Sequence, residues 1–214
     1  MTRERTATFT AYSFYAAGIA IALWRVVHPW GTLAGADVAR SGGWLAAHTF
    51  HFLAGAALCA GLPLLLATQR ERFRDALSLT AVIIAFIGSA LFTGTGVLHA
   101  FFWPSLALHA PSMVAADGPF LSPTPPLTVI TALLLSAGII FLALALRRQQ
   151  VLSTWRVVLV ALGFVLLLLP PEPLGSAPWV LFMIAGPVAG AGLVALGSAV
   201  GRAPLADALL QPER

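Results

Sequence analysis

The chain has 214 residues and a formal net charge of +4, and 59% of its residues are hydrophobic while only 9% are charged. About a quarter of the residues of an ordinary soluble domain are charged, so this composition excludes a soluble globular protein. The basic residues are scattered between apolar runs and form no stripe with interleaved aromatic residues, which excludes a nucleic-acid-binding surface. We therefore expect an integral membrane protein with no nucleic-acid partner.

Six apolar runs follow one another along the chain, and each is about long enough to cross roughly 30 Å of hydrocarbon as a helix. They cover residues 7–27, 44–67, 76–102, 126–146, 151–169 and 177–200. Helices are required because unpaired backbone N–H and C=O groups are not tolerated in lipid, and these runs lack the alternation of barrel strands. We predict an all-α fold: a bundle of about six transmembrane helices in the lipid bilayer, forming a single domain over residues 1–214.

Arginine is distributed unevenly between the connections, with only Arg25 and Arg40 falling on one side of the predicted membrane. The other side holds Arg3, Arg5, Arg70, Arg72, Arg74, Arg147, Arg148, Arg156, Arg202 and Arg214. Because positively charged connections are retained in the cytoplasm, we predict that both termini are cytoplasmic. The longer connections, 28–43 and 103–125, then lie outside. The second of these is rich in proline, which predicts an ordered but non-helical cap or a set of turns.

All five histidines fall in the outer portion of this topology. His28 ends the first run, His99 lies near the outer end of the third, and His109 follows in the next connection. His48 and His51 are three residues apart in the second run, which places them on one face of a helix. The face of His99 continues through small and aromatic residues, namely Gly96, Thr95, Phe92 and Gly88. Because small residues let helices approach closely, these two faces could meet.

This histidine pattern predicts a cofactor or metal site. Neutral imidazole binds haem iron, zinc and copper, and haem b needs axial ligands from two elements across a gap. His48, His51 and His99 are the candidate ligands for either group, and His28 is an additional candidate metal ligand. Arg25 is a candidate partner for a haem propionate. The alternatives are that the imidazoles bond one another, backbone carbonyls or interfacial water, that they relay protons, and that Arg25 only extends to the headgroups.

Two further residue types limit the functions to consider. The single cysteine, Cys59, has no partner for dithiol chemistry. The tryptophans near the predicted outer ends are typical of an aromatic belt at headgroup level; they are Trp24, Trp30, Trp44, Trp103 and Trp179. No span has an acidic residue or a lysine near its middle, which disfavours an ion-coupled carrier.

Two segments carry a resemblance to known proteins. They are Trp44-Leu45-Ala46-Ala47-His48, which leads into the second run, and Ala100-Phe101-Phe102-Trp103-Pro104, which leads to Leu106-Ala107-Leu108-His109-Ala110-Pro111. With these segments the chain resembles small multi-pass bacterial membrane proteins of a hypothetical family. The resemblance implies the bacterial plasma (inner) membrane and no assigned activity.

The sequence therefore predicts a membrane protein with a haem or transition-metal site at its outer face, acting in electron transfer or cofactor handling. One alternative is a non-catalytic subunit or assembly factor that packs against other membrane-protein subunits. A second alternative is a small-solute permease, which would need a polar path through the bundle.

Overall fold

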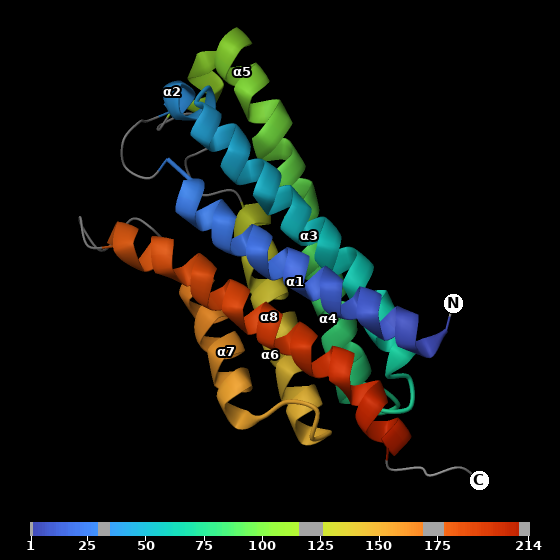
Figure 1. Ribbon diagram of the computed structural model, residues 1–214. Helices are drawn as coiled ribbons and strands as arrows, with labels where there is room; N and C mark the ends of the chain where they lie inside the picture. Colours follow the sequence, from blue (N-terminus) through green and yellow to red (C-terminus); the bar gives the residue numbers. More distant parts are fainter. Residues whose placement is uncertain (1, 30–34, 116–125, 169–177, 210–214) are drawn as a thin grey trace.

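The structure is a computed structural model that describes residues 2–29, 35–115, 126–168 and 178–209, and over these residues it contains helices and no β-strand (Figure 1). Five apolar spans are long enough to cross a membrane. They are formed by α1 (Arg3–Val27), α3 (Gly42–Thr68), α4 (Ala76–Val97) with its continuation, α6 (Pro126–Arg148) and α8 (Pro178–Leu209). The predicted all-α membrane bundle is confirmed.

The fifth predicted span corresponds to α7 (Thr154–Leu168), which has 15 residues. At 1.5 Å per residue α7 is about 22 Å long, shorter than the roughly 30 Å of hydrocarbon. Pro170 and Pro171 follow it in the sequence, and proline does not continue a helix without loss of a hydrogen bond. Residue 169 and residue 177, where predicted spans end and begin, lie outside the described residues.

Helix α7 and the five helices of the long spans pack in a closed ring, in the order α1, α3, α4, α6, α7, α8 and back to α1. The ring closes where α1 meets α8, and the two backbones lie very close together there. A Cβ added to Gly18 would lie only 2.5 Å from the carbonyl oxygen of Gly190. One apolar core runs through the bundle and includes the fully buried side chains Phe14, Leu58, Ile139, Phe164 and Leu193. Large apolar side chains on the opposite helix faces are exposed, as expected of surfaces that face lipid.

The chain after the third predicted span differs from the prediction. α4 continues through a π-helical turn, η1 (Leu98–Phe102), into α5 (Trp103–His109), and a 3-10 turn, η2 (Pro111–Val114), follows. The expected non-helical cap is therefore wrong for residues 103–109, and residues 116–125 lie outside the described residues. The wider π turn accommodates Pro104, which has no N–H to donate. Residues 76–109 form one rod of 34 residues.

A short helix, α2 (Gly35–Ala39), packs against α5 at one end of the bundle (Figure 1). There α2, α5, η2 and the start of α3 enclose a second apolar cluster, which consists of Ala39, Trp44, Trp103, Ala107 and Val114. We call this the cap cluster. Trp44 and Trp103 are only 7% and 9% exposed, so both indoles are buried in this cluster; that they lie at headgroup level stays a prediction. Trp30 and the side chain of Trp179 lie outside the described residues.

Helix α1 begins, and helix α8 finishes, at the side of the bundle opposite the cap cluster (Figure 1). The two ends of the described chain therefore lie at the same end of the bundle. That this end is cytoplasmic stays a prediction.

Candidate metal centre

Three of the predicted histidines come together beneath the cap cluster. His48 and His51 lie on α3, His99 lies in η1, and one ring nitrogen of each can be chosen so that all three lie within 4.8 Å of one another. His48 and His51 are each 4% exposed, and His99 is half-buried. We call these residues the histidine triad. The two helix faces that the sequence suggested could meet therefore do meet, at His48, His51 and His99.

A close contact between α3 and α4 brings the triad together. A Cβ on Gly96 would lie 2.7 Å from the backbone nitrogen of Phe52 and 2.8 Å from its Cα atom. Only glycine at this position lets the two backbones touch. Because Phe52 directly follows His51 and Gly96 lies one turn before His99, this contact determines how closely the imidazoles approach.

A hydrogen bond between α3 and η1 holds the backbone of His99. Within η1 the N–H of Trp103 bonds to the carbonyl oxygen of Leu98, five residues earlier. In the same register the carbonyl of His99 would need an N–H from Pro104, which has none. The indole Nε1 of Trp44 donates to that carbonyl instead, at 2.7 Å. Proline thus leaves an acceptor that a tryptophan on the neighbouring helix satisfies.

Hydrogen bonds also define which nitrogen of each α3 histidine carries a proton. The hydroxyl of Thr95 donates its one proton to the carbonyl of Phe92 at 3.0 Å, so toward His51 Nε2, at 3.4 Å, it can only accept. His51 therefore carries its proton on Nε2 and accepts at Nδ1. His48 Nδ1 lies 3.3 Å from His51 Nδ1 and must be the donor of that pair. The lone pair of His48 is left on Nε2.

Two ring nitrogens of the triad are buried without a hydrogen-bond partner among the described residues: His48 Nε2 and His99 Nδ1. A buried polar atom without a partner is unfavourable by about 1–3 kcal/mol. Buried groups of this kind are rare in folded proteins and often belong to functional sites. The triad therefore combines converging ring nitrogens with two buried nitrogens that lack a partner among the described residues.

Aromatic rings surround the triad. The ring of Trp44 lies 4.2 Å from that of His48, centroid to centroid, and Trp103 lies 4.6 Å from His99. Phe92 lies 3.9 Å and Trp24 lies 4.5 Å from the ring of His51. Trp44 and Trp103 are stacked on each other, with 5.4 Å between ring centroids and 9° between ring planes. These contacts place the imidazoles in a medium of low polarity.

His28 lies next to the triad. It ends α1, and its ring centroid is 5.3 Å from those of both His48 and Trp44. It is not one of the three residues whose ligand atoms lie within 4.8 Å of one another. The structure therefore places this additional candidate beside the site, one ring away from His48.

Arg25 is buried, at 7% exposure, so the expectation that it extends to the headgroups is wrong. Its guanidinium carbon lies 4.2 Å from the ring centroid of Trp24 and 5.2 Å from that of Phe182 on α8. The aliphatic part of the Arg25 side chain packs against the backbone of α8 at Gly186, where an added Cβ would lie only 2.6 Å from Arg25 Cγ. The ring of Trp24 contacts both the guanidinium and His51.

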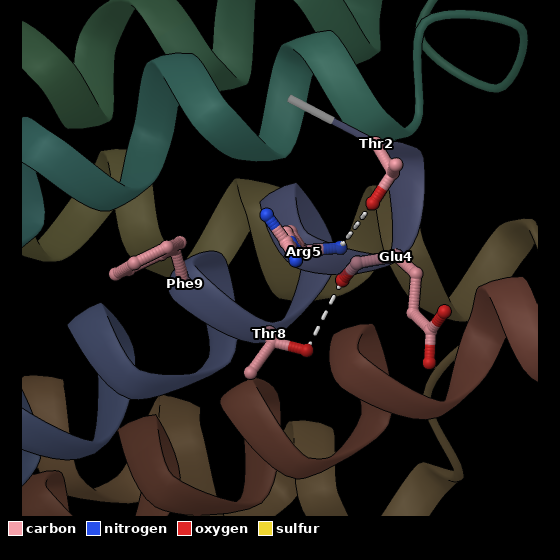
Figure 2. A pocket seen from close by; sticks show the side chains of 5 residues that line it. All are labelled: Thr2, Glu4, Arg5, Thr8 and Phe9. Carbon is pink, nitrogen blue, oxygen red and sulfur yellow. Dashed lines mark hydrogen bonds between the residues drawn. The ribbon is translucent and has the colours of Figure 1, made fainter.

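Two other candidates lie apart from the triad. His109 is exposed at the end of α5, ten residues beyond His99. A surface hollow at the start of α1 is lined by exposed residues, among them Thr8, whose hydroxyl donates to the carbonyl of Glu4 at 3.1 Å, as Figure 2 shows. That hollow is near the end of α1 opposite His28, and its hydrogen bonds only complete the first turns of a helix.

The fold and the site together define a helical multi-pass membrane protein with three converging histidines beneath a small apolar cap. No family model, no curated protein and no solved structure matches the chain. The resemblance to a hypothetical bacterial family therefore stays a prediction. Sequence reasoning missed the bond from Trp44 to His99, although Pro104, five residues after His99, is the signal that could have indicated an unsatisfied carbonyl.

Proposed function

We propose that this membrane protein binds one transition-metal ion through His48, His51 and His99. The observation that carries the proposal is the convergence of three imidazoles, two of which have a buried nitrogen without a hydrogen-bond partner among the described residues. Neutral imidazole is a ligand for zinc, copper, nickel and iron. A bound ion would take up the lone pairs that the protein leaves unpaired.

The distances suit a single ion. Ligands 2.0–2.1 Å from an ion in a trigonal or tetrahedral arrangement are separated by about 3.3–3.6 Å. One ring nitrogen from each histidine of the triad lies within 4.8 Å of the other two. Shifts of about one ångström, which small side-chain rotations supply, would close the triad on an ion.

Haem b fits this geometry less well. A haem with two axial histidines needs its planar macrocycle between two imidazoles on opposite sides. Two pairs join α3 to η1: His51 and His99, with ring centroids 6.1 Å apart, and His48 and His99, with ring centroids 4.7 Å apart. The wider pair leaves the ring of His48 only 4.7 Å from His99 and 5.6 Å from His51. A macrocycle in that gap would have to displace His48. The geometry favours a metal ion without a porphyrin.

In this proposal the protein handles a metal ion at the outer face of a bacterial plasma membrane. The distribution of arginine supports that orientation, because it leaves the connections around α2 and α5 on the side with few positive charges. Apolar packing along the ring of helices does not favour the polar path that a permease would need.

Metal analysis of the detergent-purified protein tests the proposal. The preparation is incubated with Zn(II) or, in the presence of ascorbate, with copper, freed of excess metal by gel filtration, and analysed by mass spectrometry. His99→Ala and the double variant His48→Ala/His51→Ala remove triad ligands, and His109→Ala removes an exposed histidine as the matched control. We expect one equivalent of metal per chain in the wild type and in His109→Ala, and loss of that metal in the triad variants.

Circular dichroism and gel filtration show whether each variant keeps its helices and its monodisperse state. Absence of metal from the folded wild type, or retention of metal in folded triad variants, would overturn the proposal. Addition of hemin to the same preparations tests whether the triad binds haem. A shift of the Soret band that is lost in His99→Ala would show that the bound group is haem b and not a metal ion alone.

A further inference from the structure

The chemical environment of the triad points to the identity of the ion, and this inference rests on the function proposed above. We propose that the ion is Cu(I), held by three neutral imidazoles with no anionic ligand. Three features carry the inference: the charge of the ligands, the low polarity of the surroundings and the number of ligands.

The ligand set is uncharged. Among the residues that the structure describes, no carboxylate and no thiol joins the histidines of the triad. The one cysteine, Cys59, lies eight residues after His51 on α3, about 12 Å further along the helix axis, and its sulfur contacts Thr93 Oγ1 at 3.8 Å. Nothing in the described site therefore offsets the charge of a cation.

The surroundings penalise a divalent ion more than a monovalent one. The free energy of moving an ion into a medium of low dielectric constant grows with the square of its charge, so a dication is opposed about four times as strongly as a monocation of equal size. The triad lies among the rings of Trp24, Trp44, Phe92 and Trp103. Aromatic rings also attract a cation through their π-electrons.

The number of ligands also distinguishes the metals. Protein zinc sites almost always have four ligands, with water in the fourth position of catalytic sites. Each imidazole of the triad already has an aromatic ring against it: Trp44 against His48, Trp103 against His99 and Phe92 against His51. Cu(I) has a filled d shell and is stable with two or three ligands. The triad thus meets the needs of Cu(I) without water.

Competition titrations test the inference on the full-length protein in detergent. Cu(I) is presented anaerobically with ascorbate and the chelator bathocuproine disulfonate, and Zn(II) is presented with a fluorescent zinc chelator. We expect Cu(I) to bind about a hundredfold or more tightly than Zn(II). The copper form should give no electron paramagnetic resonance signal, and X-ray absorption should show three nitrogen ligands. Zinc binding as tight as copper binding, or a fourth oxygen ligand, would overturn the inference.

A charge-changing variant tests the physical cause. His28→Asp places a carboxylate one ring away from His48, and His28→Asn is the matched neutral control. We expect His28→Asp to narrow the preference for Cu(I) over Zn(II) by about tenfold or more, since the added charge favours the dication, and His28→Asn to leave the preference unchanged. An equal preference in both variants would contradict the charge argument. Failure of the wild type to bind any metal would instead reject the metal site itself.

Discussion

The indole of Trp44 donates a hydrogen bond of 2.7 Å to the backbone carbonyl of His99, and it is the side-chain hydrogen bond that ties α3 to the π turn. In Trp44→Phe an aromatic ring remains but this donor is lost. We expect a loss of stability of about 1–3 kcal/mol, the penalty for an unsatisfied buried acceptor, together with weaker metal binding, because the backbone of His99 is no longer held. Thermal unfolding in detergent and a copper titration measure the two effects.

The matched control for this prediction is Trp103→Phe. Trp103 belongs to the same stack, but no hydrogen bond from its indole is found among the described residues. Both variants shrink an indole to a phenyl ring, so an equal loss in both would assign the effect to ring size and not to the hydrogen bond.

The contact at Gly96 should be intolerant of any added atom. Gly96→Ala would place a Cβ 2.7 Å from the backbone nitrogen of Phe52, and overpacking of this kind is unfavourable by about 1–3 kcal/mol. The separation of α3 and α4 should also move His99 away from His51 and weaken metal binding. Gly94→Ala, two residues earlier, meets nothing within 4 Å and should keep the metal and gain up to about 1 kcal/mol of stability. Similar unfolding temperatures for both variants would contradict the role assigned to this contact.

Thr95 should act on the metal through His51. Its hydroxyl accepts from His51 Nε2 and donates to the carbonyl of Phe92, and partners of this kind orient metal ligands. Thr95→Val should therefore weaken metal binding by about 10- to 100-fold, with the stoichiometry unchanged. Thr93→Val is the control, because Thr93 contacts Cys59 and the carbonyl of Ser89 instead. Chelator competition compares the two; a loss in Thr93→Val equal to that in Thr95→Val would rule out a specific effect on His51.

Stability in acid should depend on Asp75, which caps α4. Its carboxylate accepts from the backbone N–H of Ser78 at 3.0 Å and from the Ser78 hydroxyl at 2.6 Å, and these two hydrogen bonds lower its pKa. Because the pKa is lower in the folded state, the carboxylate stabilises the fold at pH values above its unfolded pKa of about 3.9. That stabilisation is lost as the pH falls through the folded pKa.

Unfolding temperatures measured from pH 7 to pH 3 test this prediction with Asp75→Asn, whose amide oxygen retains an acceptor without a charge. The wild type should be the more stable protein at pH 7, and the difference should shrink toward pH 3. A difference that is independent of pH would show that the charge of Asp75 does not contribute.

The sequence was sufficient to predict the main helices because lipid imposes one dominant requirement, which is that apolar helices span it. It also indicated that the helix faces of His48, His51 and His99 could meet, since the small residues beside His99 let helices approach closely. Charge distribution could not predict where Arg25 lies, because close packing between α1 and α8, allowed by Gly186, encloses its side chain. Hydropathy does not report such helix pairings.

Two other differences from the sequence prediction, the burial of Trp44 and Trp103 and the helix over residues 103–109, have a common physical origin in the cap cluster. Trp44 and Trp103 resemble headgroup-level tryptophans in sequence, and only the packing of α2 and α5 over them reveals that they are buried. Helix α5 itself depends on a π turn that accommodates Pro104. A proline in a sequence indicates the end of a helix, and the register change that allows the helix to continue cannot be recognised from periodicity.

The unbroken rod from Ala76 to His109 also determines how far the metal centre lies from either membrane surface. Its 34 residues extend for about 51 Å, well beyond the roughly 30 Å of hydrocarbon. His99 is 23 residues from the start of the rod, or about 35 Å along its axis. If the rod enters the hydrocarbon near Ala76, the imidazole of His99 lies at the far boundary of the apolar layer, and α5 projects beyond the hydrocarbon. An ion could then reach the triad from the aqueous side without crossing the hydrocarbon.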